Sequence, residues 1–306
     1  MAKAPKKRSC GVMAEFHRLA EKDPNYRSRL AKIEETTQRS IARMSVAKLT
    51  AVTVPVVVHV VYKTAAHNIS DAQIKSQIDI LNADYSAANA DLTKVPAPWK
   101  SIVGNARIKF KLAKVDPKGK STKGIVRVKT TVDAFSQNES VKKKSAGGSD
   151  AWNTAKYLNI WVCVLGDGLL GYAQFPGGPP ATDGVVILNT AFGSTGIAAS
   201  PFNLGRTATH EVGHFFNLRH IWGDTEDCSG SDLVSDTPRQ QLPNYNEPAF
   251  PHMSCNNGPN GDMFVNYMDY VDDKAMFMFT SAQIARMRAT LSGARKDLTK
   301  NAGSRT

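Results

Sequence analysis

Three histidines in one short stretch constrain the local fold of this chain more than any other feature of its sequence. His210 and His214 lie four residues apart, and His220 follows six residues later. Residues four apart on a helix share one face within about 6 Å, so the first two imidazoles can reach one metal ion. His220 can reach the same ion only if the helix ends between His214 and His220. Asn217 marks that turn, because Asn tolerates the left-handed conformation that ends many helices.

The same stretch predicts a catalytic metal site. Three neutral imidazoles leave one position of a tetrahedral zinc ion open, and an open position distinguishes catalytic from structural zinc sites. Glu211 stands directly after His210. A carboxylate there can take a proton from a zinc-activated water and later deliver it to a leaving amine. We therefore expect a zinc-dependent hydrolase with Glu211 as general base, and the competing interpretation is a helix with surface histidines.

Length and composition are typical of a folded protein with a sizeable core. The chain has 306 residues, of which 42% are hydrophobic and 22% are charged. No apolar stretch approaches the roughly 18 residues that a membrane-spanning helix requires, and the longest runs from Val52 to Tyr62. We therefore expect a soluble protein without a membrane partner.

The net charge of +12 lies mostly in residues 1–48, where 12 Lys and Arg face 5 Asp and Glu. A basic arm can bind polyanions, but no signature of a nucleic-acid-binding module follows it, so a solvated helical face is the favoured interpretation. Met1 to Arg8 has the positive flank of a signal peptide without an apolar core. Either the protein is intracellular or a signal peptide has been removed.

The order of the predicted elements indicates an α/β (α+β) fold with a twisted mixed sheet. Ser70 with Gln73, and Thr280 with Gln283, form capping boxes that open two helices. The expected helices lie within 11–45, broken at 23–25, and at 71–86, 207–218 and beyond 280. The expected strands are 52–62, 108–112, 126–128, 158–165 and 184–188. Residues 221–275 show almost no periodicity, which in a compact domain suggests organisation by a metal, a disulfide or a function.

The motif from His210 to His220, followed downstream by Asn266-Tyr267-Met268-Asp269-Tyr270, resembles the metzincin clan of zinc peptidases. Within that clan the sequence is most similar to the bacterial branch of the pappalysin family, over about residues 50–292. Asn217 stands where the commoner clan motif has Gly. The resemblance implies an active-site helix, a backing helix, and Met268 in a tight turn beneath the zinc.

The resemblance also implies a domain organisation and a setting. Residues 1–48 would be a small helical propeptide, residues 49–297 the catalytic domain, with an upper subdomain 49–220 and a lower subdomain 221–297, and residues 298–306 a tail. We expect a secreted, monomeric endopeptidase that cuts proteins or peptides lying between the subdomains. A catalytically silent binding protein on the same scaffold is the alternative, which the intact Glu211 disfavours. A second rival, a polyanion-binding protein, would use the basic arm alone.

Cys10 has a special place in this comparison, because the resemblance puts a propeptide cysteine at the open zinc position. A thiolate there would complete a closed tetrahedral site and keep the full-length chain latent. The alternative is a disulfide between Cys10 and Cys163, although the apolar surroundings of Cys163 favour a buried free thiol.

Further roles follow from the resemblance alone. Tyr270 would steady the oxyanion of the reaction, the alternative being a core aromatic. Cys228 and Cys255 would form a disulfide, and residues 169–175 an edge strand that pairs with substrate. Asp232 and Thr237 would bind Ca2+, the alternative being an ordinary polar turn.

Lys274 is a departure at the specificity pocket. Bacterial relatives favour Arg just after the cut bond through an acidic residue six positions past the Met-turn methionine, and that position is Lys274 here. A cation at the base of the pocket would repel Arg and favour acidic or neutral side chains. The alternative is that Asp272 or Asp273 fills the pocket, in which case Arg would be favoured. His59, which alternates with valines, is expected to be a packed core residue.

Overall fold

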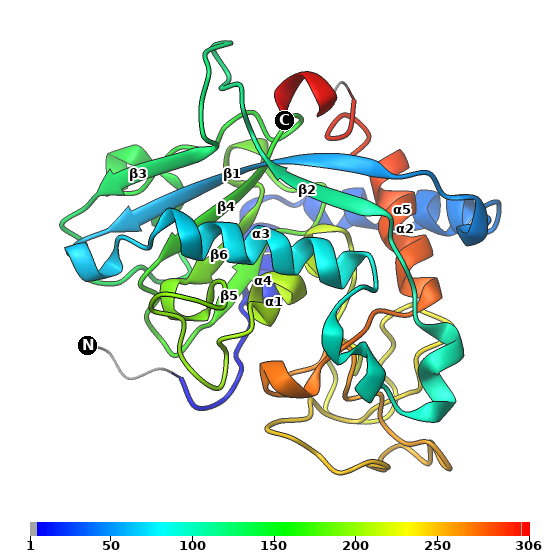
Figure 1. Cartoon of the computed structure of the whole chain (residues 1–306). Coiled ribbons are helices and arrows are strands. Elements are labelled where there is room, and N and C mark those ends of the chain that lie inside the picture. The colour runs from blue at the N-terminus through cyan, green and yellow to red at the C-terminus, as the bar shows by residue number, and fades with distance from the viewer. Residues whose placement is uncertain (1–4, 301) are drawn as a thin grey trace.

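A single mixed sheet is the centre of the computed structural model, which describes residues 5–300 and 302–306 (Figure 1). Its strands are, in spatial order, β2 (Ile108–Leu112), β1 (Val52–Tyr62), β4 (Leu158–Cys163), β6 (Val185–Leu188) and β5 (Gly171–Ala173), with β3 (Ile125–Lys129) beside the second half of β1. Only β5 runs antiparallel to its neighbour. The mixed α/β architecture predicted from the sequence is confirmed, and β5 is one edge of the sheet.

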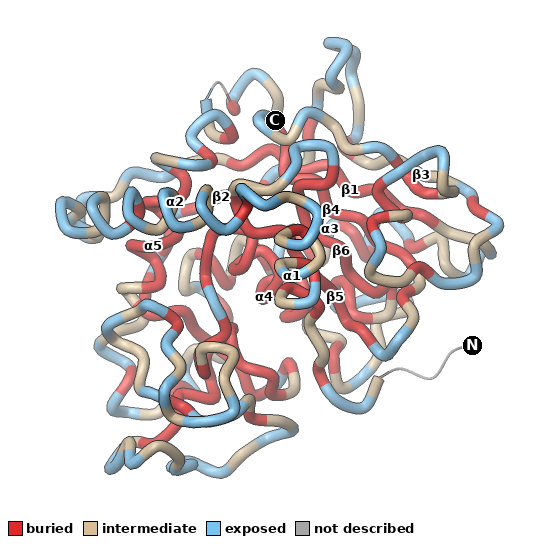
Figure 2. The backbone as a smooth tube through the Cα atoms, turned by 180° about the vertical axis from the view of Figure 1, so that it is seen from behind, coloured by how far each residue is buried: buried red, intermediate tan, exposed pale blue. Residues whose placement is uncertain are grey.

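Five α-helices pack on this sheet or on one another among the described residues: α1 (Val12–Lys22), α2 (Tyr26–Ile41), α3 (Asp71–Tyr85), α4 (Arg206–Phe215) and α5 (Ser281–Ser292). α3 packs on β2 and on α4, and α4 packs in turn on β5 and β6. α1 contacts β5, whereas α2 contacts α5. Figure 2 shows β1, β4, β5, β6 and α4 as the buried centre of the molecule, with exposed loops around them.

The two predicted capping boxes differ in outcome. Thr280 and Gln283 bond reciprocally at the start of α5, as the sequence predicts. The Ser70 side chain accepts a hydrogen bond from the Gln73 N–H, but the Gln73 amide reaches the carbonyls of Asn189 and Phe192 instead of returning to the cap. Long-range bonds to a neighbouring loop therefore replace half of the local motif.

Residues 221–272, all of them described, contain no α-helix or strand and form the lower part of the molecule (Figure 1). A disulfide joins Cys228 and Cys255 within this region. The buried Asp269 carboxylate accepts hydrogen bonds from the Asn244 backbone, the Asn244 amide and the Gln240 amide. Covalent and polar cross-links thus organise a stretch that has no regular structure.

One segment of the expected upper subdomain lies against this lower part. The Asn89 amide donates to the Phe277 carbonyl, and the Trp99 ring packs edge-on against Phe250.

Among the described residues, no helix has both the length and the apolar character needed to cross a membrane.

Candidate functional site

α4 ends at Phe215, just before the residue that the sequence marks for a turn. Asn217 has a φ of 72°, in the left-handed region. The Leu218 N–H donates to the Gly213 carbonyl at 3.0 Å, and the Asn217 N–H donates to the His214 carbonyl at 2.8 Å. This pair of bonds is a Schellman motif, which satisfies carbonyls at the helix end. The predicted turn is confirmed, and it brings His220 back beneath the helix.

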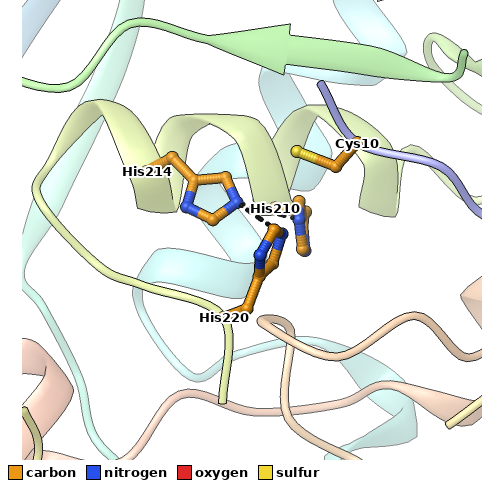
Figure 3. A group of neighbouring side chains, drawn as sticks. All are labelled: Cys10, His210, His214 and His220. Atoms are coloured by element: carbon orange, nitrogen blue, oxygen red, sulfur yellow. Dashed lines mark hydrogen bonds between the residues drawn. The ribbon is translucent and has the colours of Figure 1, made fainter. Parts of the chain in front are cut away.

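The three imidazoles converge through one nitrogen each (Figure 3). His214 Nε2 lies 3.1 Å from Nε2 of His210 and 3.1 Å from Nε2 of His220. Each Nδ1 instead meets an oxygen: the Tyr267 carbonyl for His210, the Leu218 carbonyl for His214, and the Asp224 carboxylate for His220. Such bonds fix the tautomer that leaves Nε2 free for a metal.

The donor set fits a zinc ion. Nitrogen ligands at about 2.0–2.1 Å from a tetrahedral ion lie about 3.3 Å from one another, close to the separations observed here. Burial, followed by the neighbouring imidazoles, lowers the pKa of His210 and His214 well below the usual range of histidine. Both rings are therefore neutral, which is the form that binds metals.

Cys10, in the N-terminal segment, lies beside the three histidines. These four side chains are called the metal group below. Its Sγ and the ligand nitrogens of the three histidines all lie within 4.8 Å of one another. The segment is held as an added strand on the sheet edge, because Leu170 N–H donates to the Ser9 carbonyl and Gly11 N–H to the Gly171 carbonyl. Burial and the nearby Glu211 raise the pKa of the thiol, a preference that a bound cation would reverse.

Both Cys10 and Cys163 have free thiols, and Cys163 is fully buried. The alternative of a disulfide between them therefore has no counterpart in the structure. Burial raises the pKa of the Cys163 thiol far above its ordinary value.

Glu211 and Tyr270 flank the metal group. The Glu211 carboxylate is buried, lies 3.4 Å from Cys10 Sγ, and has its pKa raised by burial to about 8. The Tyr270 ring centroid lies 5.0 Å from that of His220. The Tyr270 hydroxyl accepts a hydrogen bond from the Cys10 N–H at 3.3 Å. Both side chains thus border the space that Cys10 occupies.

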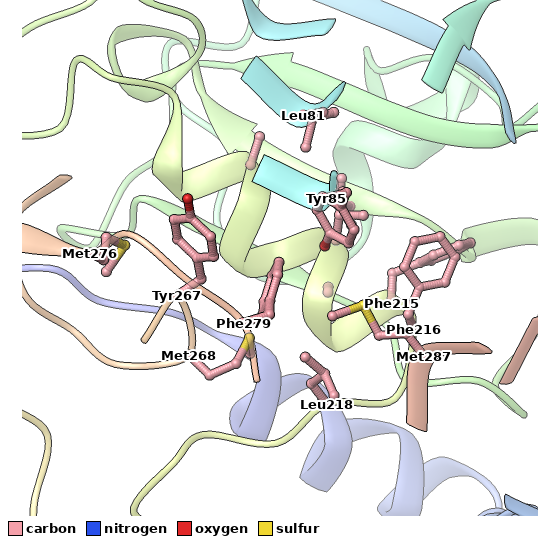
Figure 4. Close-up of a cluster of buried hydrophobic side chains, with 14 of the residues drawn as sticks. Leu81, Tyr85, Phe215, Phe216, Leu218, Tyr267, Met268, Met276, Phe279 and Met287 are labelled. Carbon is pink, nitrogen blue, oxygen red and sulfur yellow. The ribbon is translucent and has the colours of Figure 1, made fainter. Parts of the chain in front are cut away.

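Met268 lies directly against α4 (Figure 4). A Cβ atom added at Gly213 would approach the Met268 sulfur to 2.6 Å, so the helix and this turn meet where Gly213 has no side chain. The Met268 carbonyl also accepts a hydrogen bond from the Ile221 N–H, just after the third histidine. The turn around Met268 therefore lies against both α4 and the segment that carries the third histidine.

Beside the metal group, Arg8 fills a pocket whose buried acid is Asp273. The Arg8 guanidinium donates to the Asp273 carboxylate at 2.6 Å and to the Thr207 hydroxyl at 3.1 Å. Its Nε bonds the Val271 carbonyl, and the guanidinium lies over the Phe202 ring, 5.0 Å from its centroid.

Lys274, which the resemblance puts at the base of the specificity pocket, does not face Arg8. Lys274 is largely exposed and pairs with Glu247 at 2.5 Å. Residues 273–275 form a short 3-10 helix, in which consecutive side chains point in different directions. The helix turns Asp273 inward to Arg8 and Lys274 outward to solvent.

The residues expected to bind calcium are close together but already bonded to one another. The Thr237 hydroxyl donates to the Asp232 carboxylate, which also accepts from the Val234 N–H. Burial raises the pKa of Asp232 to about 7. Asp236 instead caps α5 through the Ala282 N–H, so the local acids do not all face one point.

Sequence reasoning missed one partner of the site and left another undecided. The Asp224 carboxylate bonds His220 Nδ1 at 2.5 Å, a contact that the sequence analysis did not predict. Its position four residues after a histidine was an available signal. Asp273 was not separated from its neighbours, because nothing in the sequence shows which of three adjacent side chains points inward.

Comparisons with known proteins agree with this geometry. The family model described as Pregnancy-associated plasma protein-A matches residues 141–292. An extracellular metalloprotease of Arthroderma benhamiae is 31% identical over 248 residues, covering 79% of this chain and 78% of the relative. Another, from Pyricularia oryzae, is 33% identical over 256 residues, covering 79% of this chain and 75% of the relative.

Comparison with solved structures also finds metalloproteases. A mutant of Tannerella forsythia promirolysin has a TM-score of 0.90 and 45% identity, and the match covers 98% of this chain and 99% of that one. Mature mirolysin of the same organism, in complex with a cleaved peptide, has a TM-score of 0.82 and 51% identity, covering 83% and 98%. The fold and the site therefore define a metalloendopeptidase. The chain belongs to the pappalysin family.

Proposed function

We propose that this chain is a secreted zinc endopeptidase made as a latent zymogen. The observation that carries the proposal is the convergence of three imidazoles and the Cys10 thiol beside a buried carboxylate. His210, His214 and His220 would hold the zinc, and Cys10 would occupy its fourth position in the latent form. The relatives named extracellular metalloproteases support secretion.

Residues 1–48 would act as the inhibitory propeptide. Promirolysin matches 98% of this chain and mature mirolysin 83%, a difference close to the length of that segment. Once the segment leaves, an extended protein substrate could pair with the free edge of β5 in its place. The cleaved peptide bound to mature mirolysin supports peptide substrates of this kind. We propose that the mature chain works as a monomer.

The chemistry follows from the residues around the metal group. Zinc bound there would act as a Lewis acid, which would lower the pKa of a water and polarise the substrate carbonyl. Glu211 would take a proton from the attacking water and deliver it to the leaving amine. Tyr270 would donate its hydroxyl hydrogen bond to the oxyanion that develops at the attacked carbonyl.

Digestion of denatured proteins, with cut sites mapped by mass spectrometry, tests this function. The processed chain should cut many protein substrates, and a zinc chelator or Glu211→Ala should abolish cutting. Intact substrates after removal of residues 1–48, at full zinc content, would overturn the proposal.

A further inference from the structure

Arg286 connects the zinc-binding turn to the N-terminal segment through one guanidinium. This side chain projects from α5 and is fully buried. Its Nε donates to the Asn217 carbonyl at 2.7 Å, at the left-handed residue that ends α4. Its two terminal nitrogens donate to the two carboxylate oxygens of Glu34 in α2. A planar fork of this kind suits bidentate binding of a carboxylate.

The bond to Asn217 acts on the part of the backbone that positions His220. The last carbonyls of a helix lack partners within the helix, and basic side chains can satisfy them. Arg295 plays the same part nearby, because its Nε donates to the Phe215 carbonyl at 2.7 Å. The end of α4 is therefore tied to the C-terminal helix region at two carbonyls.

The bond to Glu34 anchors the N-terminal segment away from the metal. Glu34 is 21% exposed at its side chain, and Gln38 of the same helix also donates to its carboxylate. Among the described residues, no other acceptor bonds the terminal nitrogens of Arg286 in the structure. Loss of the Glu34 carboxylate would leave a buried guanidinium without its anion, which is costly.

We propose that Arg286 is a positioning residue of the zinc-binding turn and that Glu34 uses the same guanidinium to anchor the propeptide independently of Cys10. The proposal rests on the proposed function for the meaning of the segment and the metal. The anchor on α5 would then contribute to latency separately from the contact at the metal.

The anchor is tested in full-length chains that carry Glu211→Ala, so that no autolysis occurs. Glu34→Gln replaces one carboxylate oxygen with an amide that faces guanidinium donors. Hydrogen exchange in residues 26–41 should accelerate at least about tenfold, equivalent to about 1.4 kcal/mol. Glu35→Gln is the matched control, because Glu35 is exposed and pairs only within α2. Equal hydrogen-exchange rates in the Glu34→Gln and Glu35→Gln variants would contradict the proposed anchor, whether or not the protein proves to be a peptidase.

The positioning role is tested by the metal itself. Arg286→Leu should shift the visible spectrum of the cobalt-substituted chain and speed metal loss to a chelator at least about tenfold, equivalent to about 1.4 kcal/mol. Arg286→Lys keeps a donor for Asn217 and should restore metal retention without restoring slow exchange in α2. Arg288→Leu is the control, since Arg288 bonds the Ala106 carbonyl elsewhere on α5.

An unchanged cobalt spectrum in Arg286→Leu, with metal loss equal to that of Arg288→Leu, would overturn the positioning role. Absence of metal binding in every variant would contradict the proposed function, while the exchange measurement would still decide the anchor. If Arg286→Leu fails to fold, Arg286→Lys and Glu34→Gln still separate the two parts.

Discussion

The Asp273 carboxylate makes two sets of contacts in the full-length chain, and one of them is with the N-terminal segment. One carboxylate oxygen accepts hydrogen bonds from the Leu204 and Arg206 N–H groups, just before and at the start of α4. The other oxygen pairs with Arg8. When Arg8 leaves, that oxygen faces the pocket without a cation, and a buried unpaired charge is unfavourable.

We therefore expect the mature enzyme to favour Arg just after the cut bond. A substrate guanidinium would replace that of Arg8 on Asp273, whereas the exposed Lys274 would contribute little. Asp273→Asn should lower the preference for Arg at least about tenfold, about 1.4 kcal/mol of discrimination. Lys274→Ala should leave it unchanged. Mass-spectrometric mapping of cut sites measures both, and sites that avoid Arg would contradict the assignment of Asp273.

His59 is a polar residue whose ring is buried in the core. Its two ring nitrogens bond Ser149 and Asn159, and the ring stacks on Trp161. The prediction of a packed core histidine is confirmed by its complete burial.

Burial lowers the pKa of His59 to about 4, which predicts a pH-dependent stability. Because the folded-state pKa lies below that of the unfolded chain, protonation opposes folding. Stability should be complete above about pH 6.5 and fall by about 1.4 kcal/mol per unit as the pH decreases towards 4. Urea unfolding of the Glu211→Ala chain between pH 4.5 and 7.5 measures this slope. His59→Gln should flatten the slope, and parallel slopes would contradict the assignment.

At the scale of elements, α4 and the Met268 turn constrain each other. The sequence places Gly213 within the helix, where glycine costs stability without a compensating contact. The structure supplies the reason, because the Met268 sulfur occupies the space of a Cβ atom.

Gly213→Ala should therefore destabilise the folded chain by about 1–3 kcal/mol, as overpacked cores do. It should also weaken metal retention, because the histidines flank this contact. Adding Met268→Ala makes room for the new methyl group, so the double variant should be less destabilised than the two single effects summed. Thermal unfolding and chelator titration measure these effects, and simple additivity would contradict direct contact.

The loop that the Cys228–Cys255 disulfide closes contains Asp232 and Thr237, the residues expected to bind calcium. Asp232 is buried with only neutral donors bonded to its carboxylate. A bound cation would favour its charged form, and a ligand that binds only the folded state stabilises by mass action.

Millimolar calcium should accordingly raise the unfolding temperature of the chelated, zinc-restored protein. Asp232→Ala should abolish this shift, whereas Asp227→Ala should not, because Asp227 is an exposed acid bonded to Ser229. Differential scanning calorimetry measures the shift. A wild-type transition that is indifferent to calcium would remove the site from this account.

Regular elements were predictable wherever one local signal decided them. The valine run of β1 and the Asn217 helix end are examples, and so is the histidine spacing of the metal group. Long-range pairing was not predictable. The stretch 136–150 has the composition of a polar loop, yet it buries a Glu139–Lys142 ion pair at 3.0 Å. Asp273 and Arg286 likewise acquire their roles from partners more than 200 residues away.

Across the whole molecule, the N-terminal segment contacts the rest of the chain at several separate places. Arg8 fills the Asp273 pocket, Cys10 joins the metal group, and α1 and α2 pack on β5 and α5 respectively. These contacts cover the edge of β5 that a substrate would need. The proposed latency would therefore depend on many parts of the chain, and removal of the segment must undo several contacts.

Among these contacts, Cys10 is expected to matter most for access to the metal. Three histidines and one thiolate make a closed tetrahedral site without room for the catalytic water. Activation would require a cut within residues 38–48, at the end of α2 or in the linker to β1, after which the segment leaves. Cys10→Ala should open the fourth position and hasten this processing at least about tenfold, equivalent to about 1.4 kcal/mol, at unchanged zinc content.

Cys163→Ala is the control for this prediction, because that thiol lies buried in β4, away from the metal group. Its processing rate should equal that of the wild type, whereas a disulfide between the two cysteines would make both variants alike. Gel densitometry of the full-length band, with zinc measured in parallel, distinguishes these cases. A Cys10→Ala chain as latent as the wild type would mean that Arg8 and the two helices block the cleft without help from the thiol.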